Sequence, residues 1–317
     1  MPSRFPRRAL HAHVKAIMDE TGESDPFDAV RQKARVVVTQ FESLFTDEPP
    51  FNMKAVASMR GLHWSDDDPR FSADSEIAPE SGGRVVLRVN KSRPLSRQRF
   101  SIGHEIGHTL FPEYELAVRC RKAIDRNWAD PDDLIETLCD VAASELLFPS
   151  PWFSARVQAT APCAAALAAL ADACQASRDA TIRRYVELSN APLAGVFFSW
   201  KLKPTESRKV KRDARQTPMF ADFVPLAPQP MLRIDYAIIN DAFASDCVDH
   251  LPKDKSVPSD GPIFAASSTQ SLQDGECDLD LGTVQGRFQT SVLPIFTAED
   301  STGPQGSCSV VALLQPA

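Results

Sequence analysis

The sequence feature that most constrains this chain is the motif His-Glu-x-x-His, formed by His104, Glu105 and His108. Histidines four residues apart lie on the same face of a helix, with Cβ atoms roughly 5–6 Å apart. Two imidazoles at that spacing can bind one Zn²⁺ through nitrogens at roughly 2.0–2.1 Å. Glu105 is offset from them, so its carboxylate can reach an activated water rather than the metal. The motif therefore predicts a zinc hydrolase site; the alternative is a buried helix whose histidines are only hydrogen-bonded.

Helix signals surround this motif. Ser92 can cap an N-terminus, and Pro94 can occupy the first helical position, where its missing N–H costs nothing. Apolar residues then keep helical spacing until Pro112 ends the run. Gly103 and Gly107 are poor helix formers, each about 1 kcal/mol worse than alanine. A helix tolerates such glycines when another element packs against its backbone, so we expect a close neighbour on that face.

A second stretch supplies acidic residues at helical spacing. Asp130 and Pro131 are suited to be a cap and a first helical residue, and Pro149 ends the periodic run that follows. Glu136 and Asp140 lie four apart on one face of this helix. A carboxylate from Glu136 completes a three-ligand site with an open position, which is typical of catalytic zinc. Asp140 can orient a ligand histidine through its other ring N–H, although these two carboxylates alone would also fit a solvated acidic face.

Together these stretches resemble the ImmA/IrrE family of metallopeptidases. The resemblance lies in residues 97–110, RQRFSIGHEIGHTL, in residues 136–149, ETLCDVAASELLFP, and in the strand-like segment 84–90. Cys139 and Phe148 depart from the commonest family residues, a departure that bears on packing and not on the expected ligands. The resemblance implies a zincin-like fold and a gluzincin-like zinc endopeptidase. Its implied substrate is a transcriptional repressor of the helix-turn-helix type, cleaved under stress or mobile-element control.

The overall composition is that of an ordinary globular protein. The 317 residues are 43% hydrophobic and 24% charged, which is enough to bury a core. A net charge of −7 argues against a generic nucleic-acid coat. Seven cysteines without a Cys-x-x-Cys pair indicate reduced thiols. Because no apolar run approaches the roughly 20 residues of a membrane span and the first residues lack an apolar signal core, we expect a cytoplasmic protein without a membrane partner.

A short sheet is predicted before the motif helix. Residues 81–83, Ser-Gly-Gly, are a turn signal with strand-forming residues on both sides. In zinc peptidases a sheet edge beside the metal helix pairs with extended substrate, because an open edge offers backbone donors and acceptors. The candidate substrate-binding residues are Arg84, Val85, Val86, Leu87, Arg88 and Val89. The alternative is an interior strand without a free edge.

A helical hairpin that is similar to a helix-turn-helix is predicted within residues 161–200. In one interpretation it binds DNA, with Arg178, Arg183 and Arg184 touching phosphates. In the other interpretation it packs on the peptidase domain. We favour packing, because helical hairpins are common and the motif is weak.

The chain is expected to have an α+β fold in five parts. Residues 1–24 form a flexible basic start, residues 25–160 the zinc peptidase domain with its small sheet, and residues 161–200 the hairpin. Residues 201–216 are a basic linker and therefore a domain boundary. From 217 to 317, thirteen acidic residues stand against four basic ones, and strand-like runs indicate a β-rich or α/β regulatory domain. Its position is similar to that of the GAF-like domain of some family members, which is an analogy only.

Two functional hypotheses follow. In the first, His104, His108 and Glu136 hold Zn²⁺, which polarises a peptide carbonyl. Glu105 moves the proton of the attacking water, and Asp140 supports a ligand. In the second, the chain is a DNA-binding or protein-binding regulator that uses the hairpin and the basic linker, and zinc only holds the fold. Glu105 discriminates between them, because a purely structural zinc site needs no base there.

Overall fold

The computed structural model describes residues 11–45, 48–65, 73–114, 119–121, 131–213, 228–295, 304 and 306–317. Its architecture is a mixed α+β one with two sheets, which confirms the expected fold class. The chain divides into two compact units. The first comprises Met1–Phe153 and Ala171–Ser177, and the second comprises Ser154–Leu170 and Arg178–Ala317.

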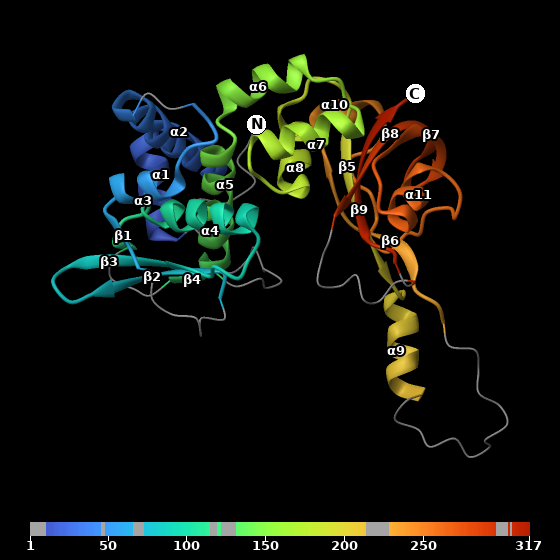
Figure 1. Cartoon of the computed structure of the whole chain (residues 1–317), viewed down its shortest axis with the longest axis horizontal. Helices are drawn as coiled ribbons and strands as arrows, with labels where there is room; N and C mark the ends of the chain where they lie inside the picture. The colour runs from blue at the N-terminus through green and yellow to red at the C-terminus, as the bar shows by residue number, and fades with distance from the viewer. Residues whose placement is uncertain are drawn as a thin grey trace. The chain divides into compact units, whose positions relative to one another are not determined.

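The first unit combines helices with a four-stranded sheet (Figure 1). Its helices are α1 (Ala12–Thr21), α2 (Pro26–Phe45), α3 (Met53–Met59), α4 (Leu95–His108) and α5 (Pro131–Leu147). Its strands are β1 (Leu62–Trp64), β2 (Ser75–Glu80), β3 (Arg84–Val89) and β4 (Arg119–Arg121). Helix α6 (Ser150–Ala159) begins in this unit and continues into the second.

The start of the chain differs from the flexible segment expected for residues 1–24. Helix α1 places Val14, Ile17 and Met18 in the core, each 1% exposed, and it packs against α2. The expectation is therefore wrong for residues 12–21, and residues 1–10 lie outside the described part of the chain. Three large apolar residues in a decapeptide are a weak periodic signal, so their burial depends on the neighbouring helix.

The small sheet of the first unit has the strand order β1-β3-β2-β4. Strands β2 and β3 are antiparallel, and the turn between them contains Gly82 and Gly83 at positive φ, as the turn signal predicted. On its other side β3 pairs in parallel with β1, from Leu62 opposite Val85 to Trp64 opposite Leu87. Strand β3 is therefore an interior strand.

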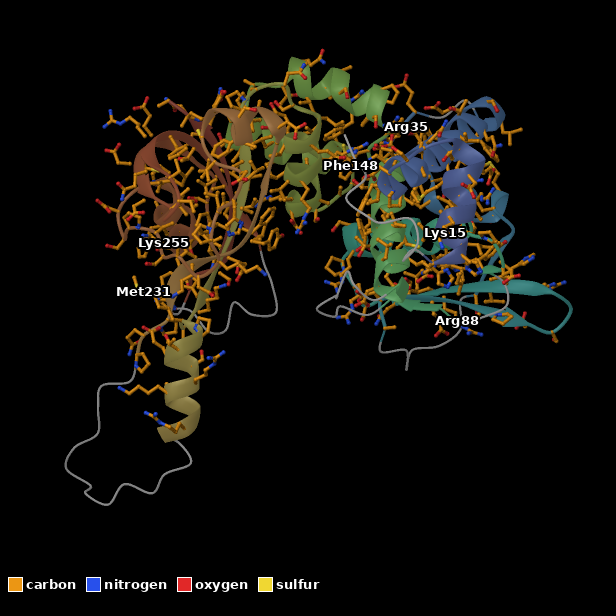
Figure 2. The ribbon with its side chains drawn as sticks, turned by 180° about the vertical axis from the view of Figure 1, so that it is seen from behind. Lys15, Arg35, Arg88, Phe148, Met231 and Lys255 are labelled. Carbon is orange, nitrogen blue, oxygen red and sulfur yellow. The ribbon has the colours of Figure 1, made fainter. Side chains whose placement is uncertain are left out.

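This pairing corrects the expected substrate edge. The backbone of β3 bonds to β1 and to β2, and the side chain of Arg88, labelled in Figure 2, pairs with Glu76 of β2 at 2.9 Å. The prediction that β3 is an open edge strand is therefore wrong. Without an open edge, the reason for assigning substrate binding to its residues is lost: Arg84, Val85, Val86, Leu87, Arg88 and Val89. No local signal marks an edge strand here, because β3 becomes interior only through β1, which precedes it by about twenty residues.

The second unit is built on a five-stranded antiparallel sheet (Figure 1). Its strands are β5 (Ala194–Lys201), β6 (Met231–Ile239), β7 (Gln273–Asp280), β8 (Gln285–Ile295) and β9 (Ser309–Pro316), in the order β6-β5-β9-β8-β7. Its helices are α8 (Arg178–Leu188), α9 (Pro204–Asp213), α10 (Asp241–Asp246) and α11 (Pro262–Thr269). Helix α7 (Ala164–Ala173) runs across the division between the units. The core of this unit joins apolar strand residues to Phe243 of α10 and Ile263 of α11.

Helices α7 and α8 confirm the two predicted helices of the hairpin. Helix α8 lies on the sheet of the second unit, because a Cβ on Gly195 of β5 would come within 3.0 Å of Ile182 and 3.4 Å of Val186. The packing interpretation therefore fits α8, but the partner observed is this sheet, whereas the peptidase domain was expected.

The three arginines considered for phosphate contact have partners inside the second unit. Arg178 donates to the carbonyl of Pro294 at 2.7 Å. Arg183 bonds to Asp179 and lies over the ring of Tyr236. Arg184 is 2% exposed and pairs with Glu187, its neighbour one turn along α8. Arg178 and Arg183 thereby link α8 to strands β8 and β6, whereas the pair of Arg184 lies within α8.

The boundary expected at residues 201–216 is also wrong. Strand β5, which the sequence analysis assigned to the hairpin part, pairs with β6 on one side and β9 on the other, and seven of its eight residues are buried. Figure 1 shows α9 extending from the end of β5, where the linker was expected. The basic run is a surface helix inside the second unit, and residues 214–227 lie outside the described part.

The cysteines whose side chains the structure describes form no disulfide, as the absence of paired spacings suggested: Cys139, Cys163, Cys174, Cys247, Cys277 and Cys308. Among the described helices, none combines the length with the apolar character that a bilayer crossing requires.

Candidate metal centre

Helix α4 carries the His-Glu-x-x-His motif and begins at Leu95, with Pro94 at its N-cap. Ser92, the expected cap, instead bonds through its backbone N–H and its hydroxyl to the side chain of Asn90 in the preceding turn. His104 and His108 are buried, and their rings meet edge to face with centroids 5.0 Å apart. The spacing of four thus places both rings on one buried face, as predicted.

Helix α5 crosses α4 at the two glycines of the motif. A Cβ on Gly103 would lie 3.1 Å from the Cα of Ala143, and a Cβ on Gly107 would lie 2.9 Å from the Cα of Cys139. Any larger residue at Gly107 would push against the backbone of α5. The two glycines therefore allow the close approach that the sequence analysis expected, and α5 is the neighbour.

This approach brings Glu136 of α5 to both histidines. Its Oε2 lies 3.1 Å from Nε2 of His104, and its Oε1 lies 3.4 Å from Nε2 of His108. Ligand atoms held tetrahedrally at roughly 2.0–2.1 Å from one Zn²⁺ are about 3.3–3.4 Å from each other. Two imidazole nitrogens and a carboxylate at these separations fit a small divalent cation. Glu136 therefore lies beside Nε2 of each of the two histidines, through a different oxygen in each case.

The other nitrogen of each histidine contacts a side chain from α5. Nδ1 of His104 lies 2.8 Å from Oδ1 of Asp140, which agrees with the orienting role expected for Asp140. Nδ1 of His108 lies 3.3 Å from Sγ of Cys139, a contact that the sequence analysis missed. A usable signal was present, because Cys139 follows Glu136 by three residues and so shares its face of the helix.

A different metal grouping is suggested by proximity alone, since ligand atoms of His104, His108 and Cys139 lie within 4.8 Å of one another. Cys139, however, faces Nδ1 of His108, while Glu136 faces Nε2 of both rings. The two nitrogens of an imidazole point in different directions, so an ion on the Nε2 side cannot also meet this thiol. Glu136 is the carboxylate that lies next to Nε2 of both rings, whereas Cys139 lies next to Nδ1 of His108 alone.

The charge state of His104 reflects its neighbours. Burial by itself lowers the pKa of this imidazole, but the hydrogen bonds to Asp140 and Glu136 outweigh burial and raise the pKa to about 9. The ring therefore holds a proton between two carboxylates when no metal is bound. A cation that binds Nε2 must replace this proton. The carboxylates of Asp140 and Glu136, which stabilise the protonated ring, would favour the positive charge of the cation in the same way.

Glu105 is fully buried on α4 and bonds to the sheet. The hydroxyl of Ser75, the first residue of β2, donates to Oε1 of Glu105 at 2.6 Å, and Ser75 is also fully buried. A short bond between two buried groups fixes the carboxylate direction. Ser75 is a second residue that sequence reasoning missed, because it lies thirty residues from its partner in a strand with no distinctive motif.

The start of β2 is tied to the start of α4 by charge. Asp74, 4% exposed, accepts hydrogen bonds from Nε and Nη2 of Arg97 at 2.9 and 2.6 Å, and it pairs with Arg93 at 2.9 Å. Arg97 lies in the first turn of α4. The salt bridges of Asp74 therefore anchor the start of β2, and this helps to hold the adjoining Ser75 opposite Glu105.

The far end of α5 is also anchored. Buried Glu145 accepts from the backbone N–H of Ser150 at 2.8 Å and from Nε of Arg35 on α2 at 3.2 Å; Arg35 is labelled in Figure 2. Phe148, labelled in the same figure, is fully buried against the ring of Phe153. The departure at Phe148 thus bears on packing, as expected, whereas at the other departure Cys139 contacts His108.

A buried His-Glu-x-x-His helix that meets a carboxylate from a second helix is an arrangement of the metallopeptidase class. Comparison with known proteins agrees. Residues 61–185 match the Peptidase_M78 family, described as the IrrE N-terminal-like domain. The radiation response metalloprotease IrrE of Deinococcus radiodurans is 29% identical over 142 residues, which are 44% of this chain and 42% of that protein. Both matches support an ImmA/IrrE assignment for residues 61–185, and the name metalloprotease implies a metal ion in the matched relative.

The match spans less than half of the length of the curated relative. A solved structure described as a Mycobacterium tuberculosis transcriptional regulator has a TM-score of 0.50 to this chain. The superposition covers 96% of this chain and 80% of the matched chain at 11% sequence identity. At that identity the likeness concerns the fold alone.

Proposed function

We propose that this chain is a zinc-dependent endopeptidase that cleaves a protein substrate, namely a transcriptional repressor of the helix-turn-helix type, in a stress or mobile-element response. The observation that carries the proposal is the position of Glu136, whose two oxygens lie 3.1 and 3.4 Å from Nε2 of His104 and His108. Three ligands of this kind leave a fourth position open, as catalytic zinc sites do.

A bound Zn²⁺ would act as a Lewis acid, polarising the scissile carbonyl and making water more acidic. His104, His108 and Glu136 would hold the ion, and Asp140 would keep Nε2 of His104 directed at it through the bond to Nδ1. These roles use the side chains in the positions that they already occupy. Little rearrangement is needed, which favours a preorganised site.

Glu105 is the proposed general base. Its carboxylate accepts a proton from the attacking water and delivers it to the leaving amine. The bond from Ser75 engages Oε1. A carboxylate has two oxygens, so this bond is compatible with proton transfer at Oε2 while it fixes the direction of the group.

The competing interpretation, a DNA-binding regulator with structural zinc, receives less support. The arginines of the hairpin bond to groups of the second unit, as described above for Arg178 and Arg184. A structural zinc site also gives no reason for a buried carboxylate at Glu105. We assign the chemistry to the first unit and propose that the second unit selects or regulates the substrate in the cytoplasm.

The proposal is tested by incubating the purified protein, with and without Zn²⁺, with the repressor encoded beside its gene. A discrete fragment that requires the metal is expected. Glu105→Gln is the matched control, because the amide is nearly isosteric but cannot accept the proton, so cleavage should fall by roughly 10²–10⁴-fold. Cleavage by Glu105→Gln at the wild-type rate would remove Glu105 from the mechanism.

A further inference from the structure

We infer that Cys139 is a positioning residue of the metal centre, which orients His108 as Asp140 orients His104. This inference rests on the metal centre proposed above. It assigns a role to the thiol that differs both from packing and from direct coordination of the metal.

The geometry around His108 carries the inference. Sγ of Cys139 lies 3.3 Å from Nδ1 of His108, and Glu136 lies 3.4 Å from Nε2 of the same ring. Cys139 is 0% exposed and His108 is 2% exposed, so both groups are removed from water. When Nε2 offers its lone pair to a metal, the proton of a neutral imidazole sits on Nδ1 and donates to the sulfur. In that tautomer the sulfur accepts the Nδ1–H bond and holds the ring with Nε2 on the side of Glu136.

The backbone of α5 places the thiol. Cys139 follows Glu136 by three residues and precedes Asp140, so one face of α5 supplies the metal-facing carboxylate and both orienting groups. Gly107 allows this face to approach, since a Cβ there would lie 2.9 Å from the Cα of Cys139. The thiol is therefore held against His108 by the same close helix contact that brings Glu136 to the site.

The two histidines receive unequal support. Asp140 offers His104 a charged oxygen at 2.8 Å, whereas Cys139 offers His108 a sulfur, which is a weak acceptor, at 3.3 Å. Loss of an orienting partner typically lowers metal affinity by about 10- to 100-fold. We therefore expect Cys139→Ala to weaken Zn²⁺ binding by about 10-fold, near the lower end of that range, and Asp140→Ala to weaken it more.

The rival role is direct coordination, since His104, His108 and Cys139 also lie close enough to share an ion. Cobalt(II) distinguishes the two roles. A thiolate bound to Co²⁺ gives an intense near-ultraviolet charge-transfer band, while a nitrogen and oxygen ligand set gives only the weaker visible bands of the metal. A positioning thiol changes the visible bands through His108 without producing the charge-transfer band.

The experiment uses the full chain as wild type, Cys139→Ala and Cys139→Ser. Cys308→Ala is the matched control, because Cys308 is an equally buried thiol outside any disulfide, in the second unit. Zn²⁺ affinity is measured by competition with a chromophoric chelator, and Co²⁺ spectra are recorded for each protein. We expect no charge-transfer band in any of them, about 10-fold weaker Zn²⁺ binding and altered visible bands in Cys139→Ala, recovery in Cys139→Ser, and no change in Cys308→Ala.

Two results would overturn the inference. One is a charge-transfer band in the wild type that disappears in Cys139→Ala, which would make the thiol a ligand. The other is a Cys139→Ala protein with wild-type affinity and spectrum. If Cys139→Ala does not fold, ring ¹⁵N NMR of the Zn²⁺-loaded wild type decides: a protonated Nδ1 and a metal-bound Nε2 at His108 support the inference, and the reverse pattern refutes it.

His104→Ala separates this inference from the proposed function. If this variant still takes up Co²⁺ as the wild type does, the metal centre itself is misplaced. If it loses Co²⁺ while Cys139→Ala is unaffected, the metal centre stands and only the role of Cys139 fails.

Discussion

The Cα of Cys139 occupies space that a side chain on Gly107 would need, at 2.9 Å from the Cβ that such a side chain would carry. The carbonyl oxygen of Cys139 would be only 3.0 Å away from the same Cβ. Backbone atoms cannot swing aside as the end of a flexible side chain can. The separation between α4 and α5, and with it the distance from Glu136 to the histidines, therefore depends on a hydrogen atom at position 107.

Gly107→Ala should separate the two helices. Overpacking of this kind costs about 1–3 kcal/mol, which outweighs the gain of about 1 kcal/mol in helix propensity. We expect lower stability in chemical denaturation and weaker Zn²⁺ binding, because Glu136 moves away with α5. Gly103→Ala is the graded comparison, since its nearest contact is longer, 3.1 Å to the Cα of Ala143. A Gly107→Ala protein with unchanged stability and unchanged metal affinity would contradict this account.

Metal content should follow the proposed ligands. We expect one Zn²⁺ per chain in wild-type protein purified without added metal, and much less in His104→Ala and Glu136→Ala. Removal of the ion by a chelator should lower the free energy of unfolding by about 2.7 kcal/mol when free Zn²⁺ had been at a hundred times its Kd. Metal analysis and thermal unfolding check both points. Equal zinc content in all three proteins would contradict the ligand assignment.

The contribution of the hydrogen bond from Ser75 to Glu105 to protein stability should be measurable without a substrate. Ser75→Ala removes a donor that lies 2.6 Å from a buried carboxylate oxygen, and should cost about 1–3 kcal/mol of stability. In a Glu105→Gln background the acceptor is a neutral amide oxygen, so the same substitution should cost less. A double-mutant cycle by urea denaturation reports the difference. Additive effects would show that the serine does not act through the charge of Glu105.

The metal-free protein should lose stability as the pH rises. The folded-state pKa of His104 is about 9, above its ordinary value of 6.5. A group with a raised folded pKa stabilises fully below its unfolded pKa, and this contribution is lost as the pH rises through the folded value. Denaturation in the presence of a chelator, at pH values below, within and above the window from 6.5 to about 9, tests this. His104→Gln is the control, and an equal decline in that variant would assign the effect to other groups.

The solubility and zinc binding of truncated chains should show at which residue the first unit can be separated from the second. A chain that ends at residue 216 keeps β5 but loses β6 and β9, which pair with it on both sides. Seven buried residues of β5 would then be exposed on a strand with two open edges, so we expect aggregation. A chain that ends at residue 177 contains the whole first unit without β5 and should be more soluble and bind zinc. Size-exclusion chromatography and metal analysis compare them; a monomeric 1–216 chain would contradict the sheet assignment.

Local pattern was enough to predict the helices that carry the site. The spacing of His104 and His108 and of Glu136 and Asp140 places each pair on one helix face, because helical periodicity is determined within a few residues. The glycines at 103 and 107 predicted a close neighbour for the same reason. The turn before β3 and the two helices of the hairpin were likewise readable from short segments.

Only the tertiary structure decided which distant segments meet. Strand β3 is interior because β1 pairs with it, and β5 belongs to the C-terminal sheet because β6 and β9 flank it. Ser75 reaches Glu105 across thirty residues of sequence, and Cys139 reaches His108 across thirty-one. Strand pairing and helix contact depend on complementary surfaces brought together by the whole fold, and a linear pattern does not encode them residue by residue.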